Sequence, residues 1–231
     1  MNKKVKPFLL TRSLQPENQE SPIHFLRKSE TPIKYFYRRS HFPYPHLNQT
    51  NYWLQVINKV EKPRFIALND LLSMPSKSLY IPLECAGNKR ANFSPKVFGE
   101  QWENGAISQG KKPVTTLNVN SIIQKPLDYS ILEKGIQKIE GIAWTGEGSI
   151  AEVQISIDNG ETWKKANLTA NPQQAYSWVK WSLQWSFEKK GEYTIFSKAI
   201  DTSGRMQPDN AFWNRKGYGF NEVAKHHISV Q

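Results

Sequence analysis

Residues 179–187 read VKWSLQWSF and carry an apolar side chain at every second position: Val179, Trp181, Leu183, Trp185 and Phe187. A period of two is typical of a β-strand that buries one face. We therefore predict a strand here, with its tryptophans in a hydrophobic core and not in a cofactor or nucleic-acid stacking role.

The neighbouring sequence repeats this pattern. AEVQISI (151–157) alternates in the same way and runs into Asp158-Asn159-Gly160, a strong signal for a β-hairpin turn. Further strands are expected at Lys138 to Trp144, at GEYTIFSKAID (191–201) and at HHISV (226–230). Residues 111–231 are thus predicted to form a two-sheet, immunoglobulin-like β-sandwich.

The first half of the chain is less regular. Prolines at positions 22, 32, 43 and 45 exclude a long helix in residues 1–50, which are expected to form an extended arm. YWLQVI (52–57) and RFIAL (64–68) are strand-like, and Asn69 is expected to cap a short helix that Pro75 ends. SLYIPLE (78–84) is expected to be a strand that leads into Cys85. The predicted fold class is mixed α+β, mostly β, with domains at 1–110 and 111–231.

Composition indicates a globular protein of 231 residues with 8 Trp, 9 Tyr and 11 Phe. No apolar run is long enough to span a bilayer and the N-terminus resembles no secretory leader, so a cytoplasmic location is expected. Of the net charge of +11, residues 1–110 carry +8, from 16 Lys and Arg against 8 Asp and Glu. An excess of positive charge attracts small anions, phosphate-bearing cofactors or nucleic acid, and the net charge alone does not distinguish among these ligands.

The single cysteine lies in LECAGNKR (83–90). Lys89 and Arg90 follow it closely, and nearby positive charge favours the thiolate that binds soft metals or attacks electrophiles. An inert buried cysteine is the alternative, and a Cys/His nucleophile pair stays open. The sequence has neither H-E-x-x-H nor zinc-spaced Cys and His pairs, so a metal at Cys85 would need most of its ligands from a non-protein group.

Four segments, taken in order, resemble the sulfite oxidase family: RRSHFPYP (38–45), LECAGNKR with FGEQWENGAIS (98–108), SIDNGETWKKA (156–166) and WNRKGYGFN (213–221). That family holds molybdenum by the two dithiolene sulfurs of a pterin cofactor, molybdopterin, and one protein cysteine. The resemblance implies a partial molybdopterin-binding domain over residues 1–110 and a molybdenum-cofactor oxidoreductase dimerisation domain over residues 111–231.

The resemblance also implies roles for individual residues. Cys85 is similar to the metal-ligating cysteine, and His41 and Ser40 to cofactor contacts, with Ser40 in place of the usual Asn. Arg39, Arg90 and Lys216 resemble the cations of the anion pocket. The backbone of a loop that passes close to the metal matches Gly105, Ala106 and Ile107.

One part of the family pattern is missing. GAISQG runs almost directly into KKPVTTLNVNSII, where family members continue with the second half of the cofactor domain. Three functions follow as hypotheses. The first is a homodimeric molybdopterin oxidoreductase that oxidises sulfite or reduces a related oxo compound and exchanges electrons with a separate partner. The second is a non-catalytic remnant whose sandwich only dimerises, and the third, ranked last because it rests on charge alone, is a nucleic-acid-binding protein.

Overall fold

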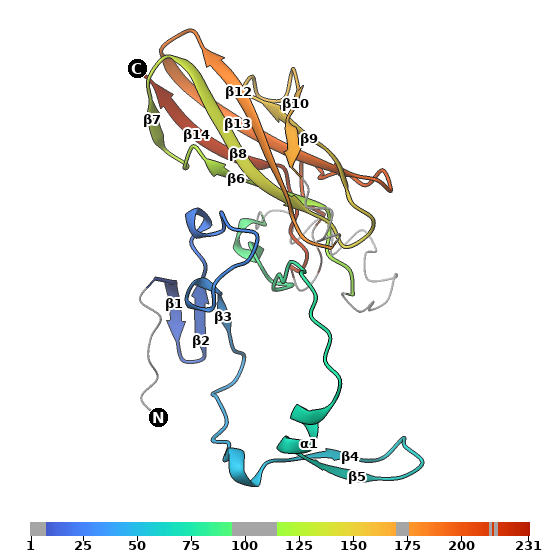
Figure 1. Ribbon diagram of the computed structural model, residues 1–231. Coiled ribbons are helices and arrows are strands. Elements are labelled where there is room, and N and C mark those ends of the chain that lie inside the picture. The colour runs from blue at the N-terminus through green and yellow to red at the C-terminus, as the bar shows by residue number, and fades with distance from the viewer. Residues whose placement is uncertain (1–7, 94–114, 170–175, 213, 215–216) are drawn as a thin grey trace. The chain divides into compact units, whose positions relative to one another are not determined.

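The computed structural model of the chain describes residues 8–93, 115–169, 176–212, 214 and 217–231. Contacts divide the chain into two units, Met1–Leu79 and Tyr80–Gln231 (Figure 1). This division falls before the boundary expected near residue 110, because residues 80–93 pack with the C-terminal unit. The sequence-based domain boundaries stay a prediction. In the described ranges, no helix has the length and apolar character needed to cross a membrane.

A small sheet occupies the start of the first unit. Strands β1 (Leu10–Leu14), β2 (Glu17–Glu20) and β3 (Arg38–Arg39) pair antiparallel in that order. The buried carboxylate of Glu17 accepts from Arg38 at 2.9 Å, so its charge is paired. The expected extended arm therefore contains more pairing than predicted: prolines exclude a long helix but leave short strands possible. Single-turn 3-10 helices η1 (Ile23–Phe25), η2 (Ile33–Tyr35) and η3 (Gln49–Asn51) complete the segment.

The rest of the first unit is a two-stranded ribbon and a short helix. Strands β4 (Trp53–Val56) and β5 (Arg64–Ala67) pair antiparallel, as their sequences predict. Helix α1 (Leu68–Ser73) also forms and ends before Pro75, but the predicted cap at Asn69 is wrong. The helix begins at Leu68, and the Asp70 carboxylate accepts from the Ala67 backbone N–H at 3.2 Å.

Large apolar side chains of this ribbon and helix face solvent. Trp53 is 58% exposed, Phe65 61% and Leu72 74%. A two-stranded ribbon without a covering layer is marginally stable by itself.

The strand predicted at residues 78–84 does not form. These residues have no strand partner in the described chain, and Pro82 lacks an N–H.

The second unit is a sandwich of two β-sheets (Figure 1). One sheet has the order β10-β9-β13-β14-β7 and the other β11-β12-β8-β6. Neighbouring strands are antiparallel except for the parallel pair of β14 and β7. The strands are β6 (Asn120–Lys125), β7 (Ser130–Leu132), β8 (Gly135–Trp144), β9 (Ile150–Ser156), β10 (Lys164–Lys165), β11 (Asn167–Thr169), β12 (Val179–Phe187), β13 (Gly191–Asp201) and β14 (Ala224–Val230).

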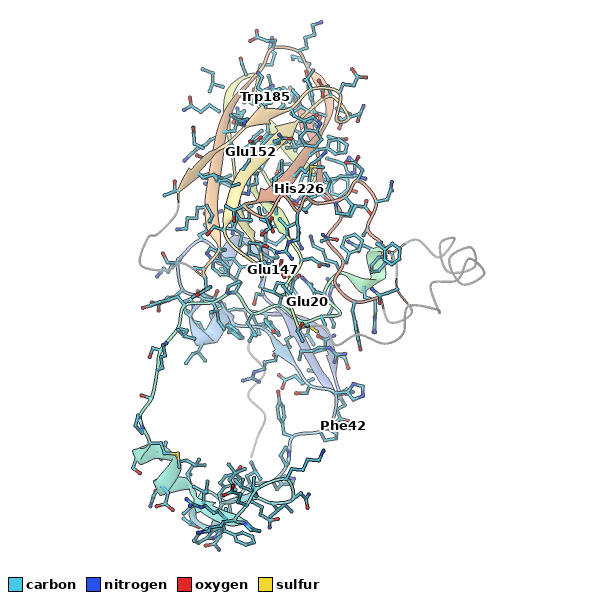
Figure 2. The ribbon with its side chains drawn as sticks, turned by 90° about the vertical axis from the view of Figure 1, so that its right-hand side faces the viewer. Glu20, Phe42, Glu147, Glu152, Trp185 and His226 are labelled. Carbon is cyan, nitrogen blue, oxygen red and sulfur yellow. The ribbon has the colours of Figure 1, made fainter. Side chains whose placement is uncertain are left out.

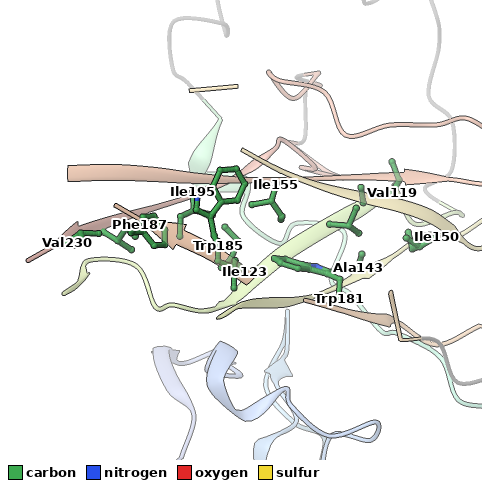
Figure 3. Packing of buried hydrophobic residues seen from close by; sticks show 14 residues of the cluster. Val119, Ile123, Ala143, Ile150, Ile155, Trp181, Trp185, Phe187, Ile195 and Val230 are labelled. Atoms are coloured by element: carbon green, nitrogen blue, oxygen red, sulfur yellow. The ribbon is translucent and has the colours of Figure 1, made fainter. Parts of the chain in front are cut away.

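The core lies between the two sheets. Trp181 and Phe187 of β12 are almost fully buried, as the alternation of that strand predicts. They pack with Ile123 from β6 and with Ile155 and Ile195 from the opposite sheet (Figure 3). The predicted strands, the hairpin after β9 and the mostly β class are confirmed. The immunoglobulin-like assignment stays a prediction.

A buried glutamine fixes the long connection between β13 and β14 to the sandwich. Gln207 Oε1 accepts from the Ala199 backbone N–H at 2.9 Å, and its Nε2 donates to Asn120 Oδ1 at 3.1 Å. The same Nε2 group donates to the backbone carbonyls of Asn221 and Glu222 at 3.3 and 3.2 Å. Every polar atom of the buried side chain is thus used, which holds residue 207 and residues 221–222 to β6 and β13.

Candidate functional site

The candidate site is the turn that carries Cys85. Its half-buried thiol lies at the start of the turn, where the Asn88 backbone N–H donates to Cys85 O at 2.8 Å. Lys89 adopts the left-handed conformation, with φ of 55°, and the single-turn helix η4 (Arg90–Asn92) follows. The chain therefore turns immediately after Cys85, and Arg90 follows as the first residue of η4.

Glu84, the residue before the cysteine, connects this turn to the sandwich. Its Oε2 accepts from the indole N–H of Trp144, at the end of β8, at 3.0 Å. Its Oε1 accepts from Asn88 Nδ2 at 2.8 Å. One carboxylate thus links a sandwich strand to the start and to the middle of the turn.

A second segment, residues 217–220, contacts residues 86–93. The Gly219 backbone N–H donates to Ala86 O at 2.8 Å, and Phe220 meets Phe93 edge to face at 5.0 Å. Gly217 has φ of +61°, and a Cβ there would lie 2.5 Å from Arg90 Cγ. Glycine therefore permits both the backbone conformation and the close approach of the Arg90 side chain.

Electrostatics around the turn are mixed. Burial lowers the pKa of Lys89 from its ordinary value, and the carboxylate of Glu84 acts in the opposite direction. Arg90 is exposed, and the guanidinium group keeps its charge in proteins. Arg90 is thus the solvent-exposed cation of this turn, and its expected role in binding an anion stays a prediction.

The structure separates the predicted residues into groups. Cys85 and Arg90 belong to the second unit and share one turn, whereas Arg39, Ser40 and His41 belong to the first unit. Arg39 Nη1 donates to Ser40 O at 2.8 Å, and the exposed His41 ring stands edge-on to Phe42. The Phe42 side chain, labelled in Figure 2, is 74% exposed. Lys216, Gly105, Ala106 and Ile107 lie outside the described residues, so their predicted roles stay predictions.

Sequence reasoning missed the supports of the turn. The sequence predicts Glu84 and Trp144 only as members of two separate strands, although the two side chains form a hydrogen bond. Gly219 has no predicted role, yet its backbone N–H donates to Ala86 O. Motif spacing carries no signal for a pairing between residues so distant in the chain.

Comparison with protein families defines the class. Residues 41–111 match the oxidoreductase molybdopterin binding domain, and residues 111–231 match the Mo-co oxidoreductase dimerisation domain. The C-terminal match covers the whole sandwich together with its connections. These two matches thus define the class of the protein as a molybdenum-cofactor oxidoreductase.

Individual relatives agree with this class. Mitochondrial sulfite oxidase of Mus musculus is 23% identical over 361 aligned positions, which take in 97% of this chain and 66% of the relative. Sulfite oxidase of Gallus gallus is 34% identical over 137 residues, 56% of this chain and 29% of the relative. The chain belongs to the sulfite oxidase family, and it spans slightly less than two thirds of the length of the mouse relative.

A solved structure shares the fold. The sulfane dehydrogenase SoxCD from Paracoccus pantotrophus superposes with a TM-score of 0.73 at 18% identity, over 94% of this chain and 85% of that chain. The mouse alignment also shows what is missing, because its 361 positions exceed the 231 residues of this chain by 130. A large internal portion of the relative therefore has no counterpart here.

The donor chemistry of the turn fits the family's cofactor. No group of three or more His, Cys, Asp or Glu side chains gathers within the described ranges to hold a metal ion. A single half-buried thiol suits a metal whose other sulfur ligands come from the cofactor, and thiolate is a soft ligand. Among the described residues, Cys85 supplies the thiol that matches this donor chemistry.

Proposed function

We propose that the chain is a molybdopterin-dependent oxidoreductase of sulfite oxidase type, with Cys85 as the protein ligand of molybdenum. One observation carries the proposal: the only cysteine of the sequence is half-buried, and both its neighbours are held, Glu84 by Trp144 and Ala86 by Gly219. A metal ligand benefits from such fixed surroundings, because partners around the ligand set its orientation.

The proposed substrate is sulfite or a related small oxo anion. Arg90 would bind the anion through charge-assisted hydrogen bonds, and the family resemblance implies the same role for Lys216 and Arg39. His41, Ser40 and the backbone of Gly105, Ala106 and Ile107 are proposed to contact the cofactor. The bound cofactor would supply the redox chemistry and the oxygen-atom transfer, while the protein supplies charge and orientation.

The proposal includes two partners. We propose that electrons leave to a separate acceptor. The match of the sandwich to a dimerisation domain supports a homodimer. We place no nucleic acid among the partners.

A second candidate is a non-catalytic remnant whose sandwich only dimerises. Two observations favour it: the alignment positions without a counterpart in this chain, and the exposure of Trp53, Phe65 and Leu72 in the first unit. A molybdopterin domain without its second half would leave such apolar side chains uncovered.

Metal analysis separates the two candidates. The chain is expressed in a host that makes molybdopterin, purified, and assayed for bound molybdenum and for the fluorescence of the oxidised pterin. We expect stoichiometric metal in the wild type and its loss in Cys85→Ala, whereas the control Asn92→Ala, an exposed residue of the same turn, keeps it.

Each outcome decides between the candidates. Metal that survives in Cys85→Ala would overturn the assignment of Cys85 as ligand. A folded wild-type dimer without metal would establish the remnant instead. Sulfite-dependent reduction of an added electron acceptor by the loaded protein tests the substrate.

A further inference from the structure

Glu84 uses both carboxylate oxygens at the thiol-bearing turn. Oε2 accepts from Trp144 Nε1 at 3.0 Å, and Oε1 accepts from Asn88 Nδ2 at 2.8 Å. Trp144 is 8% exposed at the end of β8, so its ring is fixed in the sandwich. Because hydrogen bonds to a carboxylate are stronger than neutral ones, this link is a firm connection between sandwich and turn.

The residue on the other side of the thiol is held as well. Ala86 O accepts from the Gly219 N–H at 2.8 Å, and Gly219 O accepts from Asn118 Nδ2 at 2.6 Å. Asn118 stands two residues before β6, a strand of the same sheet as β8. Cys85 therefore lies between two residues that are both attached to the sandwich.

We infer that Glu84 is a positioning residue, which holds Cys85 in place for the metal by bonding the turn to Trp144. The inference rests on the proposed role of Cys85 and adds a task for the sandwich beyond dimerisation. Without the Glu84 bond to Trp144, one side of the thiol loses its attachment while Ala86 keeps the other. The turn then opens more often, without global unfolding.

The single cysteine makes this testable without cofactor. The rate of Cys85 alkylation by iodoacetamide is measured on the cofactor-free chain at about pH 10, where an ordinary thiol is ionised, so that access of the reagent to the half-buried residue governs differences between variants. Trp144→Phe removes the donor and leaves the charge unchanged. We expect alkylation about 5-fold faster, the factor that corresponds to one hydrogen bond of about 1 kcal/mol.

Trp178→Phe is the matched control. Trp178 Nε1 is also buried but has no hydrogen-bond partner in the described part of the chain, so the same substitution removes an N–H that bonds nothing there. Its alkylation rate should equal that of the wild type. Equal acceleration in both variants would overturn the inference, since a general loosening of the sandwich would then explain the effect.

Variants of Glu84 provide a second test if Trp144→Phe fails to fold by circular dichroism. Glu84→Gln keeps an amide oxygen for Trp144, whereas Glu84→Ala removes every acceptor; both remove the charge. Fast alkylation in Glu84→Ala with rescue in Glu84→Gln supports positioning, and equal rates in the two variants contradict it. Metal retained in Cys85→Ala would instead refute the proposed function and leave the alkylation result standing.

Discussion

Replacement of Gly217 by alanine is expected to destabilise the second unit more than the same replacement at Gly204. Both glycines have positive φ, +61° and +80°. A Cβ at Gly217 would lie 2.5 Å from Arg90 Cγ and 2.9 Å from Cδ, whereas a Cβ at Gly204 would meet nothing within 4 Å. The two variants therefore share the backbone cost and differ in the collision with Arg90.

The magnitudes follow from these two contributions. Left-handed backbone costs a side-chain-bearing residue about 1 kcal/mol, which is the whole effect expected for Gly204→Ala. Overpacking adds about 1–3 kcal/mol, and the lower end applies because the exposed Arg90 side chain can swing away. We expect a loss of about 2 kcal/mol for Gly217→Ala, or about 4–8 °C in Tm.

Urea unfolding of the cofactor-free chain, followed by tryptophan fluorescence, measures both losses. A double-mutant cycle locates the difference: in an Arg90→Ala background, Gly217→Ala should cost no more than Gly204→Ala does. If the extra cost persists without the Arg90 side chain, or if the two glycine variants are equally stable, the proposed contact does not constrain Arg90. Under the proposed function, displacement of the Arg90 charge should also raise the KM for sulfite in loaded protein.

Two further predictions concern the sandwich. Hydrogen bonds from Ser156 and Thr162 lower the Asp158 pKa from 3.8 to about 2, so the stability that Asp158 contributes is complete above about pH 4 and is lost as pH falls toward 2. Asp158→Asn should flatten that part of the acid unfolding curve measured by circular dichroism, and an unchanged slope would refute the assignment. Ile195→Ala should cost about 2–4 kcal/mol through a buried cavity, whereas Ile136→Ala, at a side chain 71% exposed, should stay within about 0.5 kcal/mol in urea unfolding. Similar losses at both positions would contradict the observed core.

Local patterns predicted the sandwich well. Strands β12 and β13 have the bounds that their sequences predict, because alternation within one strand already determines which side chains are buried. Residues 78–84 have similar apolar character but form no strand. Strand formation needs a neighbouring strand, and pairing with a neighbour is a non-local property that the segment itself does not contain.

The candidate site was predictable only in part. Cys85 and Arg90 stand in one short motif, and the structure keeps them in one turn. The bond of Glu84 to Trp144 and the contact of Gly217 with Arg90 join positions far apart in the chain, which only the folded sandwich brings together. The predicted roles of Arg39 and His41 stay untested. Both residues belong to the first unit, whereas Cys85 belongs to the second.

The attachment of the Cys85 turn to the sandwich has a consequence for gene rearrangement. Since the contact division falls after Leu79, a crossover at that point would transfer the thiol together with Glu84, Trp144 and Gly219 in one piece. Loss of coding sequence between the two family domains would likewise leave these supports in the gene. A rearrangement that keeps residues 80–231 together would thus keep the cysteine with the groups that hold its turn.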